Sequence, residues 1–195
     1  MLFRTSGLNF RRKRRKMKLS TAKSAAAWAV ELLIVLLVAF VLVYCAGMRV
    51  TMVGNSMEST VSDGSQILVN RFIYNVKSPK SGDVIVFLPN GNEKSHYYVK
   101  RVIGVPGDKV QIKSGLLYVN GELYDTEDTD TIKNAGVAEE EITVGEDEYF
   151  VLGDNRNHSS DSRDPSVGIL HIDELIGRAW IRIWPLDSIG VIPHE

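Results

Sequence analysis

Ser56 and Lys100 are the two side chains of this chain whose types and setting could together cleave an acyl bond. The lysine lies 44 residues after the serine, inside Tyr97–Asp108, an apolar run of β-forming residues that closes on a Gly-Val-Pro-Gly turn. Moving an ammonium out of water favours its neutral form, which can turn a lysine into a general base at neutral pH. The pair therefore indicates nucleophilic catalysis by a serine and a lysine. Because strands alternate and lysines usually point outward, the alternative is that Lys100 lies on a solvent face.

Residues 25–47 form an apolar segment of 23 residues with one charge, Glu31. A helix rising ~1.5 Å per residue covers about 35 Å over this length, slightly more than a ~30 Å hydrocarbon core. We therefore predict a transmembrane anchor helix at 25–47. The alternative, a cleaved signal peptide, has a shorter apolar region and small residues at its cut site. Glu31 is expected to be protonated or to reach the interface, and the alternative is a partner for another helix.

The segment before the anchor, residues 1–24, carries nine basic side chains and no acidic one. Positive charge stays on the cytoplasmic side, so we predict a basic cytoplasmic tail at 1–24 and an extracytoplasmic domain at 48–195. The chain would then be a single-pass protein of the cell membrane. Taken in isolation, Arg11–Lys18 could also bind nucleic acid or direct nuclear import. A basic run directly before a span is explained by topology and anionic headgroups, which makes the lipid bilayer the expected partner.

Residues 48–195 are acidic and patterned almost entirely as β structure. They hold 14 basic and 23 acidic side chains, a balance of −9, which disfavours nucleic acid as a partner. Asn120-Gly121 predicts a tight hairpin, and His171–Leu175 a single helical turn. The segment at about 125–148 is expected to be an acidic, loop-rich excursion on the surface. The predicted strands are Gln66–Asn70, Asp83–Leu88, Tyr97–Ile103, Lys109–Ile112, Leu116–Val119, Glu148–Leu152 and Ala179–Trp184.

Eleven residues, Gly153–Arg163, follow an apolar strand and are rich in hydrogen-bonding groups. Two aspartates and two arginines at near-regular spacing can form bidentate pairs that rigidify a loop beside an active site. The alternative is a solvated loop. A Ser-His-Asp triad of Ser56 with His158 or His96 is a further alternative.

No metal and no other cofactor is expected. The four histidines are scattered, and the sequence contains neither a HExxH helix nor a CxxC pair. The stretch Gly153–Asp161 offers oxygen ligands but lacks the Gly and Glu of a calcium loop. A glycine-rich phosphate loop is also absent from the sequence.

Four blocks of the sequence together resemble bacterial type I signal peptidases of the S26 type. These are single-span, membrane-anchored serine proteases that remove signal peptides from exported preproteins. The blocks are GNSMEST at Gly54–Thr60, GDVIVF at Gly82–Phe87, YVKRVIGVPGD at Tyr98–Asp108 and GDNRNHSSDSR at Gly153–Arg163. The resemblance implies a Ser/Lys dyad and an acyl-enzyme, with Ser56 as nucleophile, Lys100 as general base and the Ser56 backbone NH as oxyanion donor.

The same resemblance implies the fold and the supporting residues. The expected fold is mainly β, with an N-terminal transmembrane helix followed by a coiled antiparallel β-sheet that forms a distorted barrel. Ser159 would orient the lysine, Arg101 would lie beside the base, and four residues would support the site structurally: Asp154, Arg156, Asp161 and Arg163.

Two positions depart from the family's pattern. Ser59 stands where proline is usual, which predicts a looser turn after Ser56. Gly54 stands where some members carry a serine that helps to bind the oxyanion, so the hole is expected to rely on backbone NH groups.

Two other classes of protein remain as alternatives. Self-cleaving repressors of the DNA-damage response share the fold and the chemistry, but they are soluble and carry a DNA-binding domain. A non-catalytic homologue could serve as an assembly factor for surface fibres. Retention of both Ser56 and Lys100 weighs against that second alternative.

Overall fold

The computed structural model describes residues 19–89, 96–124 and 131–194. Most of the basic tail and residues 125–130 of the predicted acidic excursion therefore lie outside the described residues. The chain divides into two compact units, residues 1–42 and 43–195.

Helix α1, Leu19–Ala46, makes up the described part of the first unit and continues to the start of the second. The predicted anchor at 25–47 falls almost entirely inside this helix. Between Lys23 and Val41 its mean hydropathy is 2.4, and that window is long and apolar enough to cross a membrane. None of this window is buried against other parts of the protein, so its apolar surface is available to lipid.

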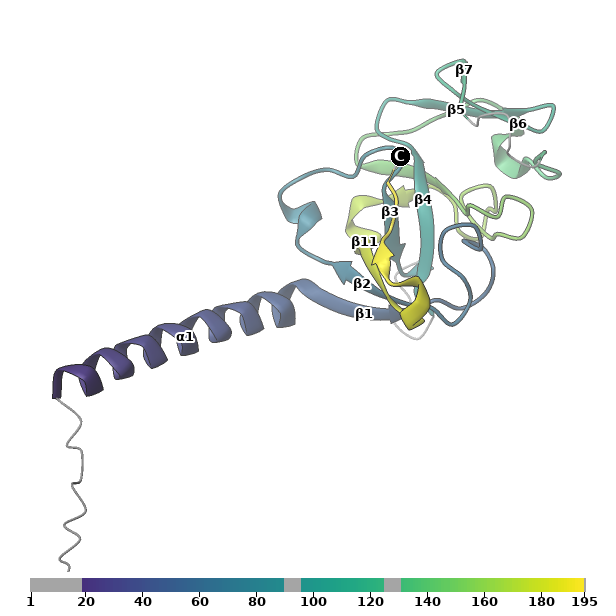
Figure 1. Ribbon diagram of the computed structural model, residues 1–195. Helices are drawn as coiled ribbons and strands as arrows, with labels where there is room; N and C mark the ends of the chain where they lie inside the picture. The colour runs from purple at the N-terminus through teal and green to yellow at the C-terminus, as the bar shows by residue number, and fades with distance from the viewer. Residues whose placement is uncertain (1–18, 90–95, 125–130, 195) are drawn as a thin grey trace, which may run out of the picture. The chain divides into compact units, whose positions relative to one another are not determined.

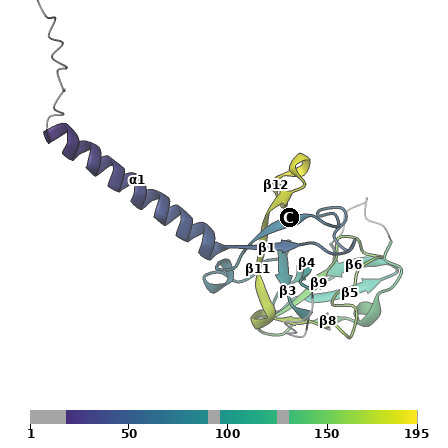
Figure 2. The same cartoon turned by 90° about the horizontal axis from the view of Figure 1, so that it is seen from below.

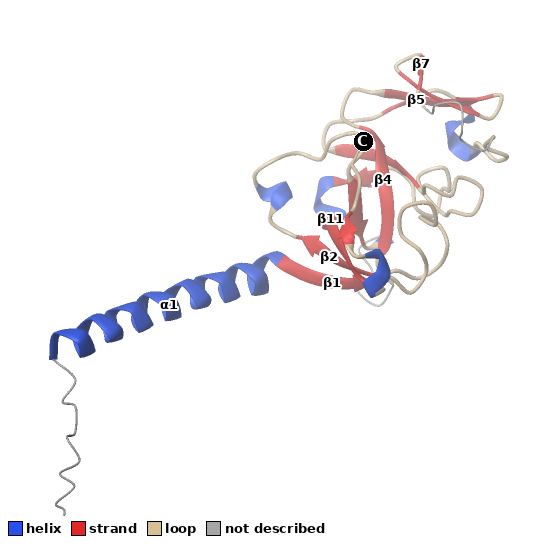
Figure 3. Ribbon diagram, viewed as in Figure 1, coloured by secondary structure: helices blue, strands red, loops and turns tan. Residues whose placement is uncertain are grey.

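Antiparallel strands build the second unit, as Figures 1 and 3 show. Within the described residues the larger sheet runs in the order β1-β2-β11-β3-β4-β9-β10, with β12 added to β11. Its strands are β1 (Gly47–Thr51), β2 (Gln66–Asn70), β3 (Val84–Phe87), β4 (Tyr98–Gly104), β9 (Glu148–Leu152), β10 (Leu170–His171), β11 (Leu175–Trp184) and β12 (Gly190–Val191).

A smaller sheet runs in the order β7-β6-β5-β8 and lies at the end of this unit remote from β1 (Figure 2). Its strands are β5 (Lys109–Lys113), β6 (Leu116–Val119), β7 (Glu122–Leu123) and β8 (Ile142–Thr143). Four short 3₁₀ helices, η1 (Ile73–Asn75), η3 (Gly136–Glu139), η4 (Ile172–Glu174) and η5 (Leu186–Ser188), connect strands in the described part of the chain. The expectation of a mainly β, antiparallel domain after one apolar helix is confirmed.

The hairpin predicted at Asn120-Gly121 is present. Val119 pairs with Glu122, which leaves a two-residue loop. Asn120 and Gly121 have φ values of 53° and 81°, the left-handed conformation that a type I′ turn requires at both positions.

Strand β4 occupies the centre of the larger sheet, between β3 and β9. Every residue from Val99 to Gly104 is buried, because both faces of this strand are covered. The alternative that Lys100 lies on a solvent face is therefore wrong, and the lysine is 3% exposed. A strand buried on both faces has no outward side for a polar residue.

The sequence pattern missed the short strands and part of the core. Strands β8, β10 and β12 have two residues each, too few to show an alternation, and β1 follows directly on the apolar helix α1. The helical turn predicted at His171–Leu175 is η4. The acidic excursion is only partly a surface feature, because η3 and β8 lie within it and its apolar residues Ile132, Ala138 and Val144 pack in the core beneath the smaller sheet.

We expect Gly177→Ala to destabilise the domain by about 1–3 kcal/mol. A Cβ at this buried position on β11 would lie 2.4 Å from the Asn70 carbonyl oxygen and 2.9 Å from Arg71 Cα, both backbone atoms that cannot turn aside. Urea unfolding of the full-length protein in detergent would measure the loss. Gly190→Ala is the matched control because no heavy atom lies within 4 Å of its Cβ. Equal stability of the two variants would contradict the close packing of β11 on β2.

Candidate active site

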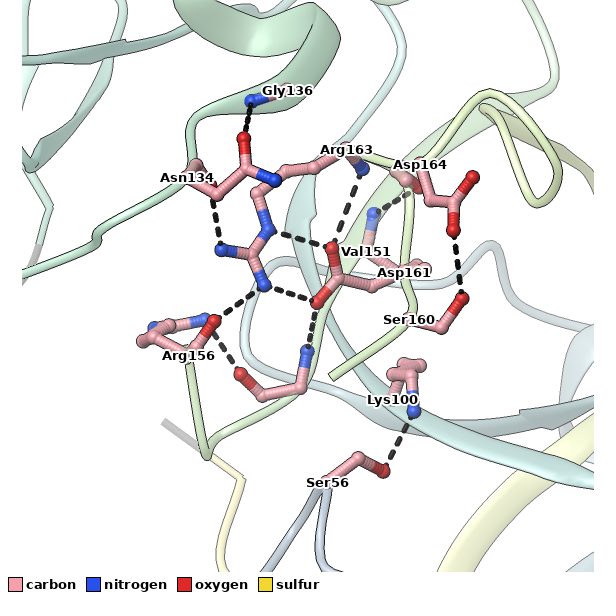
Figure 4. Close-up of polar contacts among 12 residues, drawn as sticks. Ser56, Lys100, Asn134, Gly136, Val151, Arg156, Ser160, Asp161, Arg163 and Asp164 are labelled. Atoms are coloured by element: carbon pink, nitrogen blue, oxygen red, sulfur yellow. Dashed lines mark hydrogen bonds and ion pairs between the residues drawn. The ribbon is translucent and has the colours of Figure 1, made fainter. Parts of the chain in front are cut away.

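The Lys100 amine donates a hydrogen bond of 2.7 Å to the Ser56 hydroxyl, as Figure 4 shows. Ser56 lies in the turn between β1 and β2, and Lys100 lies in the middle of β4. The fold thus brings into contact two side chains that are 44 residues apart in the sequence.

Burial lowers the pKa of Lys100 to about 8 from an ordinary value of 10.5. The carboxylates of Asp161 and Asp154 act in the opposite direction and raise this pKa, whereas the Arg163 guanidinium lowers it. The centroid of the Tyr98 ring lies 5.2 Å from the amine, a cation–π distance at which the ring favours the charged amine. A substantial fraction of the amine is therefore neutral near pH 8 and can accept a proton.

The turn that carries Ser56, residues 54–61, is the serine turn. It is fixed by its own hydrogen bonds and by the core. The backbone NH groups of Thr60 and Val61 both donate to the Met57 carbonyl, at 2.8 and 2.6 Å. Met57 and Val61 are fully buried in the core cluster between the sheet and this turn. Gly54, with φ +86°, begins the turn, and its NH donates to the Asp63 carboxylate at 2.8 Å. These contacts hold the serine at one place above the sheet.

The backbone of Ser56 is linked to the loop that follows β9. The Asn155 NH donates to the Ser56 carbonyl at 3.0 Å, and the Asn155 side chain donates to the Asn55 carbonyl at 3.1 Å. The Ser56 NH has no acceptor among the residues that the structure describes. This donor is therefore available to a negatively charged oxygen beside the serine.

Arg101, next to the lysine, has all five of its NH donors bonded. It binds both carboxylate oxygens of Asp154 at 2.8 Å, and it also donates to the Thr60 hydroxyl at 3.2 Å. The remaining donors reach the carbonyls of Gly82 and Pro193 at 2.9 and 3.2 Å. The Thr60 hydroxyl in turn donates to Asp154. One guanidinium thus ties β4 to the serine turn, the loop after β9 and the C-terminal segment.

Asp161 and Arg163 form a bidentate ion pair that closes the loop after β9 (Figure 4). Asp161 has no exposed surface, and its carboxylate also accepts from the Gly153 NH at 3.1 Å. Arg163 further donates to the carbonyls of Arg156 and Asn134, at 2.6 and 3.1 Å. The Arg156 side chain donates to the Gly153 carbonyl at 3.3 Å. Arg156, Asp161 and Arg163 are buried, and only His158 and Ser160 of the eleven residues are exposed, so the alternative of a solvated loop is wrong.

Gly153 marks the closest approach of this loop to the serine turn. A Cβ there would lie 2.5 Å from the Ser56 carbonyl oxygen and 2.3 Å from the Ser159 hydroxyl oxygen. Only a glycine allows both segments to approach this closely. Ser159 therefore lies beside the site, and its hydroxyl has no hydrogen-bond partner among the described residues.

The structure brings together most of the residues that the sequence singled out, but not the histidines. His96 and His158 are exposed, and in the described part of the chain neither is hydrogen-bonded to Ser56. His158 instead contacts Asn155. Among the described residues no group of three or more metal-binding side chains occurs.

Sequence reasoning missed the parts played by Thr60, Asp63 and Gly153. Thr60 and Gly153 stand within the segments that the sequence marked, but only the fold shows which atoms they contact. Asp63 had no signal beyond its position shortly after the nucleophile segment.

Three comparisons relate the chain to known proteins. The family described as "Signal peptidase, peptidase S26" matches residues 25–184. The chain is 36% identical over 180 residues to signal peptidase IB of Staphylococcus aureus, covering 81% of this chain and 91% of that protein. It is 34% identical over 147 residues to the probable signal peptidase I-2 of Synechocystis, covering 72% of this chain and 65% of that protein. A crystal structure of a signal peptidase I from Enterococcus faecalis is 28% identical and covers 53% of this chain and 97% of that one, with a TM-score of 0.41.

We expect the buried lysine to make the stability of the domain rise with pH. The folded-state pKa of about 8 lies below the ordinary value. Between these two values the unfolded chain binds more protons than the folded protein, so the free energy of unfolding increases as the pH rises. Relative to Lys100→Met, the wild type should therefore gain about 3 kcal/mol between pH 7.5 and 10.5. Urea unfolding of both proteins across this range would measure the difference. A difference that does not change with pH would show that Lys100 titrates normally.

Proposed function

The chain belongs to the signal peptidase family, peptidase S26, and we propose that it is a membrane-anchored serine endopeptidase that removes N-terminal signal peptides from exported preproteins. The observation that carries this proposal is the 2.7 Å hydrogen bond between the Lys100 amine and the Ser56 hydroxyl, at a lysine whose pKa is lowered by burial. This is the arrangement that a Ser/Lys dyad needs before attack.

In the proposed reaction the neutral Lys100 amine removes the proton from Ser56 as the hydroxyl oxygen attacks the scissile carbonyl carbon. The tetrahedral intermediate collapses to an ester on Ser56, and the Lys100 ammonium gives its proton to the leaving amine. Water then attacks the ester, again with Lys100 as the base, and the carboxylic acid product is released. Every proton transfer passes through the same amine, so the reaction needs no histidine and no metal.

The oxyanion is held by backbone donors. The Ser56 NH is assigned to this task because it has no other acceptor among the described residues. Gly54 has no side chain to contribute, which leaves the hole to the backbone.

The supporting residues are assigned as positioning residues. Arg101 and Asp154 hold β4 and the serine turn at a fixed separation through Thr60. Asp161, Arg163 and Arg156 hold the loop that carries Ser159. We propose that Ser159 orients the lysine from beside the site, although its hydroxyl makes no hydrogen bond to Lys100 in the described residues.

The membrane brings the enzyme and its substrate together. Helix α1 is the anchor, and the signal peptides of preproteins lie in the same bilayer. We place the basic tail on the cytoplasmic side and residues 48–195 on the outer side. The bilayer and signal peptides are thus the partners, and the acidic outer domain takes no nucleic acid. A non-catalytic assembly factor would have no use for a buried lysine on a serine hydroxyl.

We expect Ser56→Ala and Lys100→Ala each to reduce preprotein cleavage by at least about 10³-fold while the domain stays folded. Lys100→Arg should fail as well, because arginine does not lose its proton near neutral pH. Cleavage of a preprotein by the purified full-length protein in detergent would measure this. Lys113→Arg, an exposed lysine on β5, is the matched control.

The pH dependence of the wild-type rate belongs to the same test. The rate should rise with pH through a value near 8, since only the neutral amine accepts the serine proton. Substantial cleavage by Lys100→Arg, or a rate that rises near pH 6.5 and loses that dependence in His158→Gln, would remove the lysine from its role.

The orientation of the chain can be tested in intact cells. A protease added outside protoplasts should digest residues 48–195 and leave the basic tail protected, because the positive-inside bias retains residues 1–24 in the cytoplasm. Epitope tags at the two ends would report which end is cut. Digestion of the tail with the domain spared would reverse the orientation.

A further inference from the structure

We infer that Arg182 on β11 is a positioning residue that holds the serine turn in place from the neighbouring strand. Its hydrogen bond to the turn would offset the absence of the family's proline at position 59. This inference rests on the proposed function, because it concerns how fast Ser56 acts. Arg182 makes no hydrogen bond to Ser56 or Lys100 among the described residues, so its effect passes through Thr60.

The guanidinium of Arg182 joins the serine turn to the C-terminal hairpin. Its Nη1 donates to the Thr60 carbonyl at 2.9 Å, and its Nε donates to the Ser188 carbonyl on η5 at 2.6 Å. Hydrogen bonds from a charged donor are stronger than neutral ones. A rigid, planar fork that spans two carbonyls fixes their separation, which a flexible lysine would not do.

A bulge in β11 places Arg182 on the required face of the sheet. Ala179 pairs with Val69 of β2, but the register shifts before Ile181, so that Arg182 pairs with Ile67. Residues directly opposite each other in an antiparallel pair share a face. Val69 and Ile67 both face the core cluster that contains Met57 and Val61. Without the extra residue, Arg182 would point to the opposite face, away from the serine turn.

Thr60 is thereby fastened at two points. Its carbonyl accepts from Arg182, and its hydroxyl lies between Arg101 and Asp154. Thr60 ends the short helical turn that begins after Ser56, through its NH bond to the Met57 carbonyl. A displacement of Thr60 is therefore transmitted to the serine within one turn of backbone.

With serine instead of proline at position 59, the backbone of the turn itself is less restrained. Ser59 is exposed, and its NH has no acceptor among the described residues, so a proline there would lose no hydrogen bond. Proline would fix φ near −65° and reduce the freedom of the turn. Serine leaves the backbone of the turn this freedom. The hydrogen bond from the Arg182 guanidinium to the Thr60 carbonyl limits it instead.

The test is a comparison of kcat and KM for preprotein cleavage by the full-length protein in detergent. Arg182→Gln should lower kcat about tenfold and leave KM within about twofold, because the serine is misplaced while the substrate surface is retained. Arg182→Lys should recover only part of kcat. Arg71→Gln removes an arginine that is exposed and has no hydrogen bond or ion pair among the described residues, and it is the matched control.

The second arm repeats these measurements in the Ser59→Pro background. There, Arg182→Gln should reduce kcat by no more than about threefold, because the proline restrains the turn that the arginine otherwise holds. The rate profile should keep its rise near pH 8 in every variant, since Lys100 is unchanged.

The outcomes separate this inference from the proposed function. If the wild type fails to cleave, or Ser56→Ala cleaves equally well, the proposed function fails. If the wild type cleaves and Arg182→Gln matches Arg71→Gln in kcat, Arg182 has no positioning role. An equal loss of kcat on Arg182→Gln in both backgrounds would overturn the compensation for the missing proline.

Discussion

The burial of Lys100 without a carboxylate of its own is the constraint on which the rest of the site depends. Among the carboxylates, Asp161 raises the pKa of Lys100 most, and it would keep the amine charged if it were free to pair with it. Asp161 is instead occupied by the guanidinium of Arg163 and by the Gly153 NH. The ion pair on the loop thus also serves the lysine, because it keeps a buried carboxylate from binding the amine.

Covering both faces of β4 is the structural means by which this burial is achieved. The strand lies between β3 and β9, and the turn with Ser56 and the loop after β9 close over it. Polar groups buried in this way are usually paired, and most of those around β4 have a defined partner, with the Ser159 hydroxyl as an exception among the described residues. Arg101 is the fullest example, since it bonds four separate segments at once. A substitution anywhere in this network would leave a buried donor or acceptor unsatisfied.

The serine turn shows how tertiary contacts can restrain a turn that has no proline at position 59. Proline would restrain the turn through its own ring, whereas here the restraint comes from hydrogen bonds to Thr60 and from the buried side chains of Met57 and Val61. Backbone rigidity and tertiary contacts are two ways to limit the same motion. The position of a nucleophile is therefore a property of the whole turn and its neighbours.

The sequence by itself determined the apolar helix, most of the longer strands and the reactive groups, and the tertiary structure decided how they meet. Hydrophobic length gave the anchor, period-two patterns gave most of the long strands, and Asn120-Gly121 gave its hairpin, because these are local properties. Motif resemblance marked Ser56 and Lys100. Local patterns could not show that Lys100 is buried, since burial depends on which segments pack over the two faces of β4. They also could not reveal Arg182 or the core residues of the acidic segment, because a bulge and a long-range contact decide those positions.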